Sequence, residues 1–176
     1  MPIKLLLIGD NGAGKTCALA SLLSAGYNVR VANLDNGVEA LENILQGPKS
    51  KYAKDSLSRL RYRTLTERMR TLQGRIIPAS ATVWQKTVEL LENFTDDREE
   101  FKDEKLGGVH KWTEKDVFVL DTLSTLGTAA LNFHLSINGK LTEIRSGYDA
   151  QRDIGEAQKF VDLEPEQPFA HMTLGH

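Results

Sequence analysis

An eight-residue glycine-rich stretch near the start of the chain constrains the fold more than any other feature. Residues 9–16 have the form G-x-x-x-x-G-K-T, and they lie between the apolar run 3–8 and a segment, 17–25, with leucines at helical spacing. Glycines permit backbone conformations in which successive N–H groups converge on one anion, and a helix N-terminus adds its positive dipole end. A strand, such a loop and a helix in this order predict a site for the phosphates of a nucleotide.

Individual residues of this stretch have distinct expected roles. Lys15 is expected to bridge the β- and γ-phosphates of ATP as a point charge, and the Thr16 hydroxyl to complete the shell of a Mg²⁺ ion. The alternative interpretation is a glycine-rich turn that happens to precede a lysine. The residues expected to contact the nucleotide are Gly9, Asp10, Asn11, Gly12, Ala13, Gly14, Lys15, Thr16 and Cys17.

Composition excludes several classes of protein. The 176 residues suffice for one compact domain, and a formal net charge of −2 provides no global attraction to nucleic acid. Cys17 is the single cysteine, which fits a reducing compartment, and we expect it to be a small buried residue. No apolar run is long enough to span a bilayer and no signal peptide is evident, so a cytoplasmic protein without a membrane partner is expected.

The order of apolar segments predicts an α/β fold. A strand at 28–33 with alternating valines is followed by a turn and by a helix at 38–45 that ends at Gly47-Pro48. Together with the first strand and helix, this order predicts a doubly wound, mostly parallel sheet with ligands at the carboxyl ends of its strands. Further along, the pattern predicts helices at 79–93, 123–135 and 150–163, within a core of 1–163 that is followed by a tail, 164–176.

A second informative stretch is the apolar run 117–120, which ends in Asp121. It predicts a strand buried on both faces, whose last residue emerges at the phosphate-binding end of the sheet, as a Walker B aspartate does. Asp121 is expected to hold Mg²⁺ through water, opposite Thr16.

Two segments have opposite charge. Residues 49–75 contain nine basic and two acidic residues, and Arg59, Arg61 and Arg63 alternate with uncharged residues as on one face of a strand. This arginine face is either a solvated strand face or a patch for nucleic acid or nucleotide. Residues 89–104 contain eight acidic and two basic residues, and the overlapping segment 95–108 is expected to form a solvated surface loop, with pairing to the basic segment as the alternative.

With both nucleotide motifs present, the chain resembles the RecA-like P-loop ATPases encoded by phages and prophages, in the group associated with single-strand annealing and recombination. The resemblance implies an ATP- and Mg²⁺-dependent enzyme that hydrolyses the γ-phosphate, binds single-stranded DNA, and acts as a homo-oligomer or with a phage recombination partner in the host cytoplasm. It covers about residues 3–163 and depends on residues 7–16, 31–37, 108–113, 116–124, 130–132 and 137–139.

The chain departs from this family at two points. RecA-like ATPases usually place a water-activating Glu near the end of the second strand, where this chain has Asp35, with Glu39 one helical turn later. The family also has a strand after the Walker B strand, which here only the tail could supply, near 169–174. The resemblance further implies DNA contacts in the loop 136–148, through Lys140, Arg145 and Tyr148, with a plain solvated loop as the alternative.

Two other classes of function compete with an ATPase. The first is a nucleotide-dependent DNA-binding or assembly switch with little or no hydrolysis. The second is a GTPase or small-molecule kinase; the GTPase is disfavoured because the chain has no Asn-Lys-x-Asp motif, whereas a kinase acceptor pocket has no fixed signature.

Overall fold

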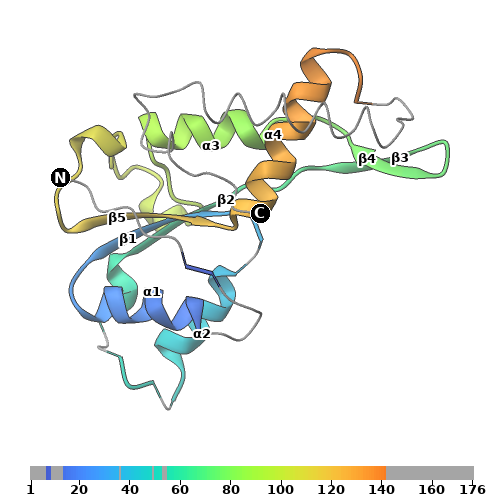
Figure 1. The fold of residues 1–176 in the computed structure, drawn as a ribbon. Helices are drawn as coiled ribbons and strands as arrows, with labels where there is room; N and C mark the ends of the chain where they lie inside the picture. The colour runs from blue at the N-terminus through green and yellow to red at the C-terminus, as the bar shows by residue number, and fades with distance from the viewer. Residues whose placement is uncertain (1–6, 9–13, 36, 49, 53–54, 142–176) are drawn as a thin grey trace. The chain divides into compact units, whose positions relative to one another are not determined.

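The computed structural model describes residues 7–8, 14–35, 37–48, 50–52 and 55–141 (Figure 1). The chain divides into two compact units, one made of Met1–Leu65 with Val88–Thr122 and the other of Thr66–Thr87 with Leu123–His176. The predicted strand at 3–8 falls mostly outside the described residues, as do the predicted helix at 150–163 and the tail. Leu7 and Ile8 are described; both are exposed and lie in no strand.

The first unit contains a parallel three-stranded sheet in the order β2-β1-β5 (Figure 1). Its strands are β1 (Asn28–Asn33), β2 (Leu60–Thr64) and β5 (Asp116–Asp121), so the strands predicted at 28–33 and 117–121 are confirmed. All six residues of β5 are only half-buried, which corrects the expectation of burial on both faces. The physical reason is that β5 is an edge strand of the described sheet, whereas β1 is central.

Two helices, α1 (Lys15–Ser24) and α2 (Val38–Gln46), cover one face of this sheet (Figure 1). Both were expected at these places, and α1 ends where Gly26 adopts a positive φ of 89°. The core between helices and sheet consists of small and branched apolar side chains, which interlock without polar atoms. Its buried members are Ala20, Leu23, Val29, Val31, Val38, Leu41, Leu45 and Leu60.

Alternate residues of β1 point to the opposite face, where an aromatic cluster packs. Phe94 contacts both Trp112 and Phe118 edge-on, with ring centroids 5.9 and 6.4 Å apart. The Arg30 guanidinium lies 4.9 Å from the Trp112 centroid and forms an ion pair of 2.7 Å with Asp116. Charge on this face is therefore neutralised and covered by aromatic rings.

The outer edge of β2 is covered by the segment 96–98. Asp96 Oδ2 accepts the Tyr62 N–H at 3.0 Å, Asp97 Oδ2 accepts the Thr64 N–H at 2.6 Å, and the Asp97 N–H donates to Tyr62 O at 3.0 Å. Arg98 Nη2 donates to Leu60 O at 2.6 Å. Backbone groups that an open edge would offer to another chain are thus satisfied internally.

Each of the three alternating arginines of the basic segment is paired with a carboxylate. Arg61 is buried, lies 2.5 Å from Glu104 Oε2 and stacks on the Phe101 ring at 3.6 Å. Arg59 pairs with Asp55 at 2.6 Å, and Arg63 with Asp97 at 3.1 Å. The acidic segment is therefore not merely a solvated loop: Glu104 and Asp97 pair with arginines of β2, as the alternative interpretation predicts. The partner of each arginine could not be predicted from the sequence, because Arg61 and Glu104 are 43 positions apart.

Asp96 is expected to be a stability determinant of the first unit. Its side chain is 0% exposed, and although burial opposes ionisation, hydrogen bonds from the Arg98 side chain and from the Arg98 and Tyr62 N–H groups hold its pKa below the ordinary value. Asp96→Ala leaves the Arg98 charge and the Tyr62 N–H unpaired, and should lower the free energy of unfolding by about 3 kcal/mol. Chemical denaturation measures this loss.

Exposed Asp103 provides the control, since Asp103→Ala should change the free energy of unfolding by less than about 0.5 kcal/mol. A lowered pKa in the folded state means that the Asp96 contribution is present above its unfolded pKa and disappears as the pH falls through the folded value. Asp96→Asn should therefore flatten the acid limb of the stability profile. Equal acid sensitivity of Asp96→Asn and wild type would contradict this assignment.

The second unit contains a β-hairpin and a long helix. Strands β3 (Met69–Leu72) and β4 (Arg75–Pro78) are antiparallel and joined by Gln73 and Gly74, which both have positive φ. Helix α4 (Leu123–Ile137) agrees with the predicted helix at 123–135, and α3 (Val83–Glu92), within the predicted 79–93, crosses the boundary between the units. Three short 3₁₀ helices complete the described elements: η1 (Ser56–Arg59), η2 (Glu99–Phe101) and η3 (Val109–Lys111).

None of the helices in the described part of the chain is long and apolar enough to cross a lipid bilayer.

Candidate functional site

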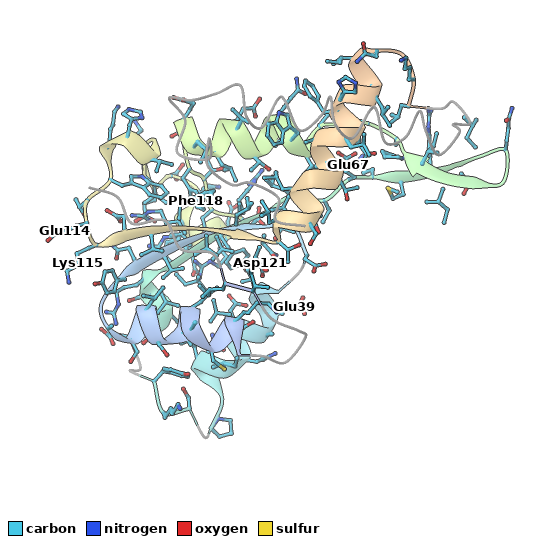
Figure 2. The ribbon with its side chains drawn as sticks, in the orientation of Figure 1. Glu39, Glu67, Glu114, Lys115, Phe118 and Asp121 are labelled. Atoms are coloured by element: carbon cyan, nitrogen blue, oxygen red, sulfur yellow. The ribbon has the colours of Figure 1, made fainter. Side chains whose placement is uncertain are left out.

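The candidate site lies where β1 and β5 end. Asn33 and Asp121 are register partners in the last row of these parallel strands, and Asp35 follows β1 directly. The charges of both Asp35 and Lys15, the first residue of α1, act on the Asp121 carboxyl group. Three predicted site residues from separate segments therefore come together in the first unit, with Asp121 at the end of β5 (Figure 2).

The Asp121 carboxyl group is electrostatically unsatisfied by protein alone. Burial raises its pKa above the ordinary value, the neighbouring Asp35 raises it further, and Lys15 opposes both effects. A divalent cation would remove this unfavourable charge state, because it lowers the pKa of adjacent carboxyl groups.

The donor set fits Mg²⁺. The hydroxyl of Thr16, in the first turn of α1, and one or two carboxylates are hard oxygen ligands, and Mg²⁺ usually takes its remaining ligands from water and substrate phosphates. Within the described ranges, no group of three or more His, Cys, Asp or Glu side chains is arranged to hold an ion. The donors thus suit a metal that arrives with a nucleotide rather than one held in a protein cage.

The start of α1 suits an anion. Gly14 adopts φ 88°, a left-handed conformation that favours glycine, and lies immediately before the helix. Among the described residues no side chain caps this helix end, and its first turn contains no acidic residue. The first N–H groups and the positive dipole end are therefore not neutralised by these residues. The rest of the predicted phosphate loop, Gly9–Ala13, lies outside the described residues.

Gly37 lies so close to the Asp121 carboxylate that no residue with a β-carbon would fit at this position without moving it. A Cβ built on Gly37 would overlap Oδ2 of Asp121, although its φ of −72° is open to every residue. The Gly37 N–H donates to Asn33 Oδ1 at 3.1 Å, and Asn33 Nδ2 donates to Thr64 Oγ1 at 3.2 Å. The Leu34 N–H donates to Asp121 O at 2.6 Å. The turn after β1 thus sets the position of the aspartate at the end of β5.

Sequence reasoning missed this supporting role of Asn33 and Gly37. The signal was present as the turn Asn33-Leu34-Asp35-Asn36-Gly37, but turn propensity alone accounts for those residue types. Nothing local indicates that a strand more than 80 positions later ends against Gly37.

The two candidates for the water-activating acid differ in their surroundings. Asp35 raises the pKa of Asp121, whereas Glu39 is an exposed residue of the first turn of α2 and is not among the charges that shift Asp121 (Figure 2). Electrostatic coupling therefore favours Asp35 as the acid that shares the site with Asp121.

Two further predicted positions have been located. Cys17 is exposed, which corrects the expectation of a buried residue: at about 100° per residue it lies about 60° from Ala20 and about 120° from Leu23, at the side of the buried stripe of α1. Lys140 follows α4, and its N–H donates to Leu135 O at 2.8 Å. Arg145 and Tyr148 lie outside the described residues.

Asp35→Asn should shift the pH dependence of Mg²⁺ binding. In the wild type, Mg²⁺ affinity with nucleotide should fall as the pH drops through the raised pKa of Asp121, because protonation removes the ligand. Removing the Asp35 charge lowers that pKa, so binding should persist to lower pH. Calorimetric titration of Mg²⁺ at a series of pH values measures the midpoint.

Glu39→Gln removes the same charge from exposed α2 and should leave the midpoint unchanged. A raised pKa also means that ionised Asp121 lowers the stability of the metal-free fold as the pH rises through that value. Asp35→Asn should therefore raise the melting temperature of the metal-free protein at neutral pH. Identical midpoints for wild type and Asp35→Asn would show that the two carboxylates are not coupled.

The fold and site define an α/β protein whose charged residues converge at the carboxyl ends of parallel strands. Comparisons with protein-family models, with curated proteins and with solved structures gave no match to this chain.

Proposed function

We propose that this chain is an ATP- and Mg²⁺-binding ATPase with a RecA-like, doubly wound P-loop fold, of the kind that phages use in DNA recombination or repair. The observation that carries the proposal is the convergence of Lys15, Asp35 and Asp121 at the carboxyl edge of the sheet. A Walker A lysine, a Walker B aspartate and an acid after the neighbouring strand are the parts that γ-phosphate hydrolysis needs.

Each residue then has a defined task. Residues 9–14 and the first N–H groups of α1 bind the phosphates, Lys15 neutralises the β- and γ-oxygens, and Thr16 and Asp121 hold Mg²⁺. When bound, the ion would polarise the phosphates and reduce their charge repulsion. Asp35, or Glu39 in the second assignment, orients a water and takes its proton as the water oxygen bonds to the γ-phosphorus and the bond to the β–γ bridging oxygen breaks.

The main alternative is a nucleotide-dependent DNA-binding or assembly switch with little or no hydrolysis. The residue that favours it is Asp35, because aspartate has a shorter reach than the glutamate that RecA-like ATPases use at this point. A small-molecule kinase is a less favoured alternative, since the same phosphate site would serve transfer to an acceptor.

ATP turnover with and without single-stranded DNA separates these functions. An ATPase should release inorganic phosphate, faster with DNA if DNA completes or orders an oligomer. Tight ATP binding and salt-sensitive DNA binding without phosphate release would support the switch. Phosphate transfer to a small acceptor would support the kinase, and failure to bind ATP at all would overturn the proposal.

The resemblance to phage RecA-like ATPases is the basis for proposing DNA and partner proteins. Single-stranded DNA, a homo-oligomer or a phage recombination partner, and the host cytoplasm are the expected setting, with Lys140, Arg145 and Tyr148 as the loop contacts to DNA.

A further inference from the structure

Three large apolar side chains of the β3–β4 hairpin are exposed to solvent. Relative exposure is 56% for Met69, 38% for Leu72 and 73% for Ile76, and every residue of β3 is exposed. These are three of the six large hydrophobic residues that are exposed among the described residues. An isolated hairpin is at best marginally stable in water, so the exposed apolar side chains indicate a surface that binds something.

The register divides the hairpin into two faces. Met69 pairs with Pro78 and Thr71 with Ile76, so the exposed side chains of Met69, Thr71 and Ile76 share one face. Arg70 pairs with Ile77 on the other face, and Arg68 lies two residues before Arg70 on that same face. Leu72 shares the Arg70 face, so one face of the hairpin is apolar and the other carries the arginines together with Leu72.

Arg68 and Arg70 differ from five other arginines whose side chains the structure describes. Arg30, Arg59, Arg61, Arg63 and Arg98 all pair with carboxylates. Arg68 and Arg70 are exposed, and no carboxylate of the described residues pairs with either of them. Glu67, the acid next to them in sequence, accepts the Val83 N–H through Oε1 at 3.2 Å and is thus engaged with α3 (Figure 2). Two arginines of the basic segment without a carboxylate partner among the described residues therefore lie directly before β3 and within it.

We propose that single-stranded nucleic acid binds across the outer edge of β3, where every residue is exposed, with Arg68 and Arg70 contacting phosphates on one face and Met69 and Ile76 contacting base faces on the other. Guanidinium groups match phosphate oxygens bidentately, and apolar side chains insert readily between unstacked bases. A single strand offers phosphates and accessible base faces together, whereas a duplex keeps those faces stacked. An acidic protein surface would also satisfy the arginines and is the competing occupant of this surface.

Fluorescence anisotropy of a labelled oligodeoxythymidylate tests this proposal on the full chain without nucleotide. The oligonucleotide should be about 30 nucleotides long, which exceeds the roughly 4–16 nucleotides that one binding module covers. Arg68→Gln with Arg70→Gln should weaken binding about tenfold and reduce the slope of log Kd against log salt by about 1.4, the value for two phosphate contacts on a single strand. Met69→Ser with Ile76→Ser should weaken binding and leave that slope unchanged.

Matched variants control for charge and apolar content. Lys105→Gln with Lys111→Gln removes the same charge from exposed positions, and Ile8→Ser removes an exposed isoleucine outside the hairpin; neither should change Kd more than about twofold if binding is local. Thermal unfolding verifies that every variant is folded, and the single arginine substitutions should each carry about half of the change in slope.

Three outcomes would overturn the proposal: no oligonucleotide binding by the wild type at low salt, equal losses in hairpin and control variants, or displacement of the oligonucleotide by poly-glutamate at equal charge concentration. The last outcome would show that the hairpin binds polyanions by charge alone, without preference for nucleic acid. Because this assay contains no ATP, its failure is distinct from a failure of ATP binding, which a separate titration measures.

Discussion

Lys15→Ala is expected to weaken ATP binding about 100-fold or more, which corresponds to about 2.8 kcal/mol. Charge-assisted hydrogen bonds to phosphate contribute about 1.5–3 kcal/mol each, and Lys15 would contact two phosphate groups. Burial and the Asp35 charge raise the pKa of Asp121, and the Lys15 charge lowers it. The substitution should therefore weaken Mg²⁺ binding as well, because Asp121 then holds its proton to higher pH.

Isothermal titration with ATP, with and without Mg²⁺, measures both losses. Lys105→Ala is the matched control, since Lys105 is exposed and outside the site. The melting temperature of metal-free Lys15→Ala should stay within a few degrees of the wild type if the residue acts through the ligand. Unchanged ATP affinity in Lys15→Ala would overturn the nucleotide-binding assignment as a whole.

Gly37→Ala is expected to weaken Mg²⁺-dependent ATP binding about tenfold or more, with little loss of stability. The new methyl group would occupy the place of the Asp121 carboxylate, whose terminal oxygen must move away. The backbone at Gly37 is unstrained at φ −72°, so the substitution introduces no conformational penalty of its own. Displacement of one metal ligand should lower metal affinity while leaving the phosphate contacts of α1 in place.

Nucleotide titrations at zero and saturating Mg²⁺ separate the two effects. ADP binding without Mg²⁺ should be almost unchanged in Gly37→Ala, whereas the gain on adding Mg²⁺ should largely disappear. Gly127→Ala in α4 is the control, because a Cβ there meets nothing within 4 Å and alanine favours a helix interior. Wild-type Mg²⁺ dependence in Gly37→Ala would show that Asp121 is not the metal ligand.

Several elements of the first unit were predictable from local pattern. Strand β1 and helix α2 have strong periodicity and clear ends: valines alternate in β1, and Gly47-Pro48 follows α2. Strand β5 was recognised from its apolar run, although its burial was overestimated. Local pattern suffices here because each element buries a face that is continuous in sequence.

The β3–β4 hairpin was not predicted from the sequence, and the reason is also physical. A two-residue hairpin turn of this kind needs positive φ at both positions, which Asn-Gly or Asp-Gly signals strongly and Gln73-Gly74 signals weakly. The many arginines around the turn indicated a charged segment, and the two short strands within it were not recognised. The pairing of β2 with residues 96–104 was likewise hidden, because complementary charge in sequence does not specify which arginine meets which carboxylate.

Residue type and local spacing alone predicted β1, β5, α1 and α2 of the first unit, the glycine-rich start of α1, and Lys15, Thr16 and Asp121 as site candidates. The tertiary structure decided which acid lies beside Asp121. Both Asp35 and Glu39 satisfied the pattern, but only Asp35 is coupled to Asp121, and Gly37 is the residue whose missing side chain makes room for that carboxylate. The physical reason is that parallel strands distant in sequence end at one edge, and the contacts formed there are properties of the packed sheet.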